Sequence, residues 1–118
     1  MINFTPSTGA MACASRTTTG TILTVPAGIV WSGELFMSAS VALAATATPS
    51  VTVSGTGANP DSGTVVHRLS LTGLALTTVH GSGTISIIVV APPGNAVTLE
   101  FATGGATSAT IVANGFFV

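Results

Sequence analysis

The stretch Gly33-Glu34-Leu35-Phe36-Met37-Ser38-Ala39-Ser40-Val41-Ala42-Leu43 alternates with a period of two. One set of alternate positions is entirely apolar: Leu35, Met37, Ala39, Val41 and Leu43. The other set holds Glu34, Phe36, Ser38, Ser40 and Ala42. Successive side chains of a β-strand point to opposite faces, so this pattern is typical of a strand that is buried on one side. We expect it to be a central strand of a small all-β domain.

Shorter segments of the same kind follow one another along the chain, separated by turn residues. They number about eight, at intervals of roughly 8–12 residues, which is the pattern of an antiparallel β-sandwich or small barrel. No segment has a helical period. We therefore predict a single-domain β-sandwich over residues 20–118, jelly-roll-like, with an immunoglobulin-like topology as the open alternative. Residues Met1 to Thr19 lack sustained periodicity, and we expect an extended N-terminal arm there, with Phe4 as an apolar anchor.

Three local expectations concern the middle of the chain. Thr64 to Leu71 is expected to be one strand, and Gly73 to break the chain before Leu74 to Val79. His80-Gly-Ser-Gly83 is expected to be a tight connection. The run Thr84 to Val90 contains Ile87-Ile88-Val89-Val90, and such an unbroken apolar run predicts burial on both faces.

Charge is scarce in this chain. Only 4% of its 118 residues are charged, against about 25% in ordinary globular proteins. Two arginines cannot form the basic surface that nucleic acids or anionic membranes require, so neither is an expected partner. No apolar run approaches the roughly 20 residues of a membrane-spanning helix. The first residues show no signal-peptide pattern, and we expect a protein that is made and kept in a cytoplasm or assembled into a particle there.

The residues with catalytic potential are few and scattered. The carboxylates are Glu34, Asp61 and Glu100, and a glycosidase pair could be drawn between Glu34 and Glu100. Both alternate with apolar residues, which favours a role in solubility. His67 and His80 are too few for a metal site, and His67 is expected to be a hydrogen-bonded core or interface residue. We expect Cys13 to be a small buried or interface residue. The sequence thus predicts no enzyme, no cofactor and no metal site.

The large aromatic residues are the candidates for contact with other molecules. They are Phe4, Trp31, Phe36, Phe116 and Phe117. Phe36 lies on the side of its strand opposite the Leu35–Val41 face, and Phe116-Phe117 lie near the end of the chain. Exposed apolar side chains are unfavourable in water. Each residue is therefore expected either to pack in the core or to lie in an intermolecular contact.

Two segments carry a resemblance to a known class of protein. Thr24-Val-Pro-Ala-Gly28 precedes a strand with Trp31, and Ala91-Pro-Pro-Gly-Asn95 precedes Val97-Thr-Leu99. With the Thr-, Ser- and Ala-rich composition, these make residues 24–117 resemble small virion proteins of tailed bacteriophages, most closely the decoration or cement proteins of the capsid.

This resemblance implies a structural protein of the virion that binds the outer surface of the phage head, commonly as a homotrimer. Its partner would be the major capsid protein, whose adjacent subunits it would clamp, and an N-terminal arm would often serve attachment. No catalytic residue carries over. The competing hypotheses are a phage tail or fibre module, and a carbohydrate- or cell-surface-binding β-sandwich.

Overall fold

The chain folds into antiparallel β-sheets, as the alternating patterns predict. The computed structural model describes residues 10–42 and 45–118. Ten strands lie in these residues, and none of these residues is helical. The strands are β1 (Met11–Arg16), β2 (Gly20–Val25), β3 (Val30–Val41), β4 (Thr46–Ala47), β5 (Ser50–Ser54), β6 (Val65–Arg68), β7 (Leu71–Thr72), β8 (Val79–Val90), β9 (Val97–Ala102) and β10 (Ser108–Phe117).

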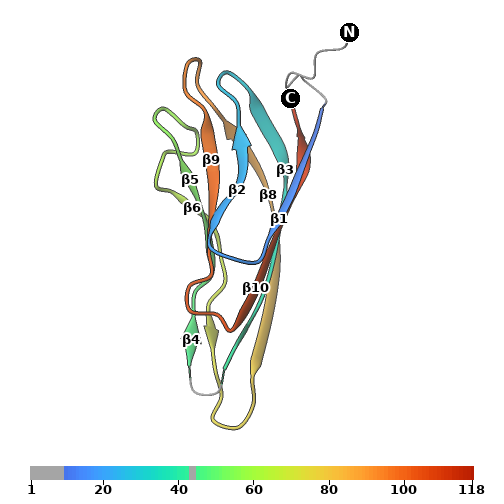
Figure 1. Cartoon of the computed structure of the whole chain (residues 1–118), viewed down its shortest axis with the longest axis vertical. Coiled ribbons are helices and arrows are strands. Elements are labelled where there is room, and N and C mark those ends of the chain that lie inside the picture. The colour runs from blue at the N-terminus through green and yellow to red at the C-terminus, as the bar shows by residue number, and fades with distance from the viewer. Residues whose placement is uncertain (1–9, 43–44) are drawn as a thin grey trace.

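Two four-stranded sheets form the layers of the sandwich (Figure 1). Sheet A has the strand order β1-β10-β3-β8, and sheet B has the order β2-β9-β5-β6. The short strands β4 and β7 form a separate pair beyond one end of sheet B. The fold is therefore an all-β sandwich in which β1 and β8 are the edges of sheet A.

The core lies between the sheets and is built by the expected alternation. On β3 the fully buried side chains include Leu35, Met37 and Val41, while Glu34 and Phe36 face outward. The strand β9 repeats this pattern with Val97, Leu99 and Phe101, and β10 with Ala109, Ile111 and Ala113. The central position predicted for the Gly33–Leu43 stretch is confirmed over residues 33–41, because β3 is paired on both sides.

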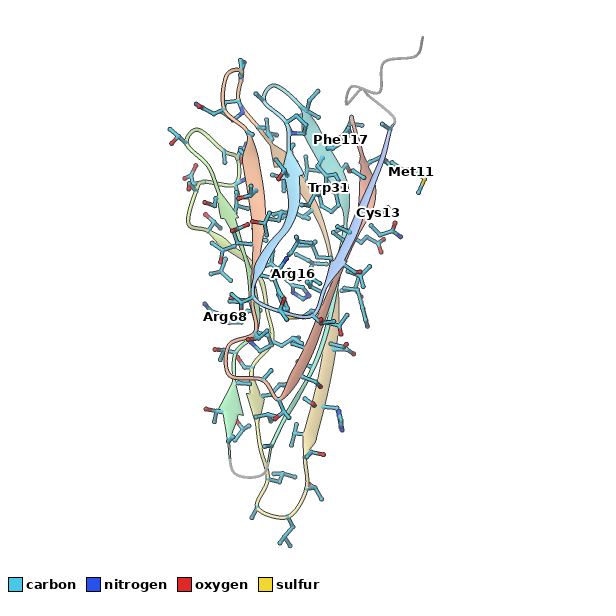
Figure 2. The ribbon with its side chains drawn as sticks, in the orientation of Figure 1. Met11, Cys13, Arg16, Trp31, Arg68 and Phe117 are labelled. Atoms are coloured by element: carbon cyan, nitrogen blue, oxygen red, sulfur yellow. The ribbon has the colours of Figure 1, made fainter. Side chains whose placement is uncertain are left out.

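Trp31 lies between the sheets (Figure 2). Its indole approaches two glycines, Gly33 and Gly115. It is fully buried, and its Nε1–H donates to the carbonyl of Ala12 on β1 over 3.0 Å. A Cβ atom on Gly33 would lie 2.7 Å from Cζ2 of the indole, and one on Gly115 would lie 2.9 Å from the same atom. Both glycines are therefore needed for the indole to lie against the inner face of sheet A.

The sandwich begins earlier than expected, because residues 11–16 of the predicted arm form an edge strand. β1 pairs antiparallel with β10, from Met11 opposite Phe116 to Arg16 opposite Ile111. Its inward positions include Ala12 and Ala14, whose small side chains give little contrast with the outward ones. Because of this lack of contrast, the strand could not be recognised from the sequence pattern. The expected anchor Phe4 lies outside the described residues.

The Arg16 side chain fixes the turn between β1 and β2. Its guanidinium donates to the carbonyls of Thr18, Thr19 and Thr21, at 2.7, 3.0 and 3.3 Å. Gly20 makes room for this arrangement, because a Cβ there would collide with the guanidinium. One of the two arginines is therefore used to shape a turn.

Two expectations for the region of β8 are wrong. His80-Gly81-Ser82-Gly83 is not a turn but the first half of β8, paired with the second half of β3. Its glycines face inward, where a Cβ on Gly81 would collide with Leu71 of β7 and one on Gly83 would lie 3.3 Å from the His67 ring of β6. Ile88 is not buried but 59% exposed, because the outer face of sheet A has no layer above it.

The segment before β8 also differs from the expectation. The predicted strand from Thr64 to Leu71 divides into β6 and β7, with a register shift between β5 and β6. The expected segment Leu74 to Val79 is a loop up to residue 78, and it exposes Leu74 and Leu76. Turning the chain here leaves β8 free to run the full length of β3.

Candidate functional site: the outer face of sheet A

The outer face of sheet A carries a group of large apolar side chains. We call the following four residues the apolar patch: Met11 (77% exposed), Phe36 (42%), Ile88 (59%) and Phe116 (48%). They come from β1, β3, β8 and β10, so every strand of the sheet contributes one. In Figure 2 the labelled Met11 side chain points away from the sandwich. A folded chain exposes large apolar side chains together mainly where another molecule covers them.

The strand register places three of these residues in one row. Met11 is opposite Phe116, Phe116 is opposite Ser32, and Ser32 is opposite Ile88. The small Ser32 side chain between Phe116 and Ile88 leaves a hollow of about 800 Å³. Gly33 and Gly115, which leave room for the Trp31 indole on the inner face, also line this hollow.

The next row of the same face adds polar groups to the hollow. It runs Cys13, Asn114, Glu34, Ser86 across the four strands. The Cys13 thiol lies 3.0 Å from Oδ1 of Asn114, to which it can donate. Cys13 is exposed, so of its two expected roles the buried one is wrong, and the interface role stays a prediction. The hollow therefore combines apolar walls with one carboxylate and one amide.

The other half of the outer face is polar and made of small side chains. Ser38 and Ser40 of β3 lie between Thr110 and Ser108 of β10 on one side and the residues of β8 on the other. Oγ of Ser40 and Oγ of Ser108 are 2.6 Å apart and share a hydrogen bond. A shallow polar depression that includes His80 lies at this end. The face is thus divided into an apolar and a hydroxyl-rich half.

The aromatic candidates divide between core and surface. Phe36 and Phe116 belong to the apolar patch, whereas Trp31 is fully buried and Phe117 is 9% exposed. Phe117 faces inward because it follows Phe116 on a strand, and its amide donates to the carbonyl of Ala10. Of the two roles left open for these residues, Trp31 and Phe117 take the core role.

The two glutamates do not form a pair. Glu34 lies on the outer face of sheet A, and Glu100 alternates with the buried Leu99 and Phe101 on sheet B, so it faces the opposite side of the sandwich. Glu100 lies between Thr21 and Thr52, and its Oε2 atom is buried without a hydrogen-bond partner among the described residues. This geometry excludes a glycosidase that uses both carboxylates at one site.

His67 was expected to be a hydrogen-bonded residue of either the core or an interface. The structure places it in the core. It is buried on β6, and its Nε2 lies 3.0 Å from the carbonyl oxygen of Gly83 on β8. Because the acceptor is a carbonyl, Nε2 carries the proton. Within residues 10–42 and 45–118, no group of three or more His, Cys, Asp or Glu residues could hold a metal ion.

Sequence reasoning found half of the apolar patch. Phe36 was singled out as an aromatic residue on the polar side of its strand and Phe116 as an apolar residue near the end of the chain, whereas Met11 was assigned to an arm and Ile88 to a doubly buried strand. A signal for Ile88 was present, because His80, Ser82, Thr84 and Ser86 share its parity and indicate an exposed face. For Met11 no local signal existed.

Comparison with models of known protein families and with characterised proteins finds no match for this chain. Nowhere in the described residues is there a helix with the length and apolarity needed to cross a membrane.

Proposed function

We propose that this chain is a non-enzymatic structural protein that acts by binding other proteins through the apolar patch. The observation that carries the proposal is the exposure of Met11, Phe36, Ile88 and Phe116 together on one sheet face. Complete burial of such a side chain contributes about 1.5–3 kcal/mol. Covering even part of the patch would therefore favour binding, and no catalytic residue is needed for this role.

The particular role that we propose is that of a decoration protein on the head of a tailed bacteriophage. The resemblance of residues 24–117 to such proteins supports it, and the low charge and the exposed apolar side chains on the outer face of sheet A are compatible with it. In this role the partners are the major capsid protein and further copies of the chain, as a trimer. Repeating a modest contact over many copies makes the attachment strong.

The test is binding to phage heads assembled without this chain. Heads are mixed with the purified protein and pelleted, and the bound protein is quantified. Wild type is expected to pellet with the heads. The double variant Phe36→Ser, Phe116→Ser is expected to lose at least tenfold in affinity because it removes half of the apolar patch.

Val65→Ser is the matched control for that variant. Val65 is also an exposed apolar strand residue, but it lies on β6 of sheet B, away from the apolar patch. It should bind heads like wild type. Equal binding by the double variant would refute a role for the patch. Binding to purified tails but not to heads would replace the head assignment by that of a tail or fibre module.

A carbohydrate-binding module is the second candidate, because the hollow combines an aromatic ring with polar groups. Phe116, Glu34 and Asn114 all line it. Sugars are commonly held between an aromatic face and hydrogen-bonding side chains. A glycan array in which wild type binds and Glu34→Ala does not would support this function. An array without hits would reject it.

A further inference from the structure

The edge of sheet A formed by β8 is unusually long and is not paired along most of its length. β8 pairs with β3 over all twelve of its residues. On its other side, Asn59 forms a bridge to Val90, and no described strand pairs with the remainder. Natural proteins generally shield long edge strands with charges, prolines or bulges, because bare edges accept further strands. From Gly81 to Val90 this strand contains no charge and no proline, and its pairing with β3 shows no bulge.

The hydrogen-bonding pattern determines which backbone groups of β8 face outward. The amide of Ala91 donates to the carbonyl of Ile29 over 3.0 Å, so the Val90–Val30 pair is of the non-hydrogen-bonded type. In an antiparallel ladder the two types alternate. The odd-numbered residues of β8 therefore bond to β3. The even-numbered ones point their N–H and C=O groups away from the sheet: His80, Ser82, Thr84, Ser86 and Ile88.

The core is also open along this edge. The opposing edge strand of sheet B, β6, has only four residues, against twelve in β8. The inward side chains of Ile85 and Ile87 are consequently only half-buried, whereas Leu35 and Met37 on the neighbouring strand are fully buried. A further strand beside β8 would satisfy the free backbone groups and cover these two isoleucines.

We propose that this further strand is β8 of a second copy, paired antiparallel about a two-fold axis at Thr84. Pairing about this residue places Ile85 and Ile87 of one copy opposite Gly83 and Gly81 of the other. Large side chains thus meet glycines on the inner face. On the outer face Thr84 meets Thr84, and Ser82 meets Ser86; such hydroxyl pairs are favourable across strands.

The charge distribution also fits two identical edges. Between Gly81 and Val90 no side chain is ionisable, so the like edges do not repel each other. The contact is isologous and joins copies in pairs. It uses the backbone edge of β8, to which the apolar patch contributes only Ile88, and it is argued from strand pairing alone, so it does not depend on the proposed function. If the proposed trimer also forms and its three-fold axis crosses this two-fold axis at right angles, the two contacts together give six chains.

The first test is the solution mass of the full chain, measured by light scattering after size exclusion. Wild type is expected to contain an even number of chains, two or six. Ser86→Pro is expected to halve that number, because proline removes an outward N–H and blocks strand addition. The N–H that it removes is not bonded to β3, so the fold should persist. Ser86→Ala keeps the N–H and should keep the wild-type mass.

A second variant tests the register and does not depend on proline being tolerated. In a Cys13→Ser background, Thr84→Cys places two thiols opposite each other across the axis. Their Cα atoms would be about 5.5 Å apart, within the usual range for a disulfide. Oxidised glutathione should convert this variant to a covalent dimer. Thr110→Cys in the same background lies on β10 and should remain uncrosslinked.

The proposal fails if wild type is a monomer or a simple trimer. It also fails if correctly folded Ser86→Pro keeps the wild-type mass, or if Thr84→Cys crosslinks no better than Thr110→Cys. A monomeric wild type refutes the proposal whatever the head binding of Ser86→Pro, because Ser86 also lines the hollow on the outer face.

Discussion

The single tryptophan shows how one residue constrains its neighbours. The indole of Trp31 lies against Gly33 and Gly115, so these positions leave no room for a side chain. We predict that Gly33→Ala lowers the free energy of unfolding by about 1–3 kcal/mol, because the added methyl would overpack the core. Denaturant unfolding followed by Trp31 fluorescence measures this. Ser32→Ala, on the neighbouring outward position, should change stability by less than about 0.5 kcal/mol. Equal stability of the two variants would contradict the tight fit of the indole.

The two arginines allow a matched comparison of turn stabilisation. The guanidinium of Arg16 donates to three carbonyls of the β1–β2 turn, whereas Arg68 is exposed. Lysine keeps the charge but cannot hold three carbonyls in this fork-like geometry. We predict that Arg16→Lys lowers the melting temperature and that Arg68→Lys does not. Differential scanning calorimetry of both variants provides the measurement, and an equal effect of the two would refute the special role of Arg16.

Among the elements, β6 is an edge strand that pairs with β5 in sheet B and is joined to β8 of sheet A by a side-chain hydrogen bond. The imidazole of His67 joins it to β8 through the carbonyl of Gly83. A buried hydrogen bond of this kind contributes about 0.5–1.5 kcal/mol. We predict that His67→Leu speeds amide hydrogen exchange in Val65–Arg68, as β6 opens more often. His80→Leu, on the outer face, should leave that exchange unchanged. Unchanged exchange in His67→Leu would show that pairing with β5 and apolar packing hold β6 without this hydrogen bond.

The elements also show how far the sequence could predict this fold. Strands that are buried on one face can be predicted from the alternation of apolar and polar residues. In β3, β9 and β10 the burial of the side chains follows this alternation residue by residue. The edge strands β1 and β8 of sheet A could not be predicted over their full length in this way. β1 has alanines on its inner face, and β8 has glycines where Leu71, His67 and Leu69 approach. Their positions depend on partners far away in the chain, so a local pattern could not give them.

The same reason limits prediction of the site. The exposed ring of Phe36 could be anticipated from the polar residues on the same side of its strand, whereas for Phe116 the sequence left core packing and a contact surface open. That Met11 and Ile88 join Phe116 in one row depends on the pairing of residue 11 with residue 116, and of residue 32 with residue 88. Only the assembled sheet creates the apolar patch.

At the scale of the whole molecule, the scarcity of charge determines how the protein can associate. Of its five charged side chains, Arg16 is engaged in a turn, Glu100 is half-buried and Glu34 lies in the hollow. No ionisable side chain lies between Gly81 and Val90 on β8. Association through the β8 edge must therefore rest on backbone hydrogen bonds and apolar contact, which salt screens little.

We predict that the dissociation constant for self-association changes less than about threefold between roughly 0.1 and 1 M NaCl, where the Debye length falls from about 10 to 3 Å. Sedimentation equilibrium at the two salt concentrations measures it. Thr84→Lys is the informative counterpart, because it places two ammonium groups opposite each other at the proposed axis. It should associate weakly at 0.1 M and regain part of its affinity at 1 M, as screening reduces the repulsion. A wild-type protein that dissociates at high salt would instead require ion pairs between copies, which this edge cannot supply.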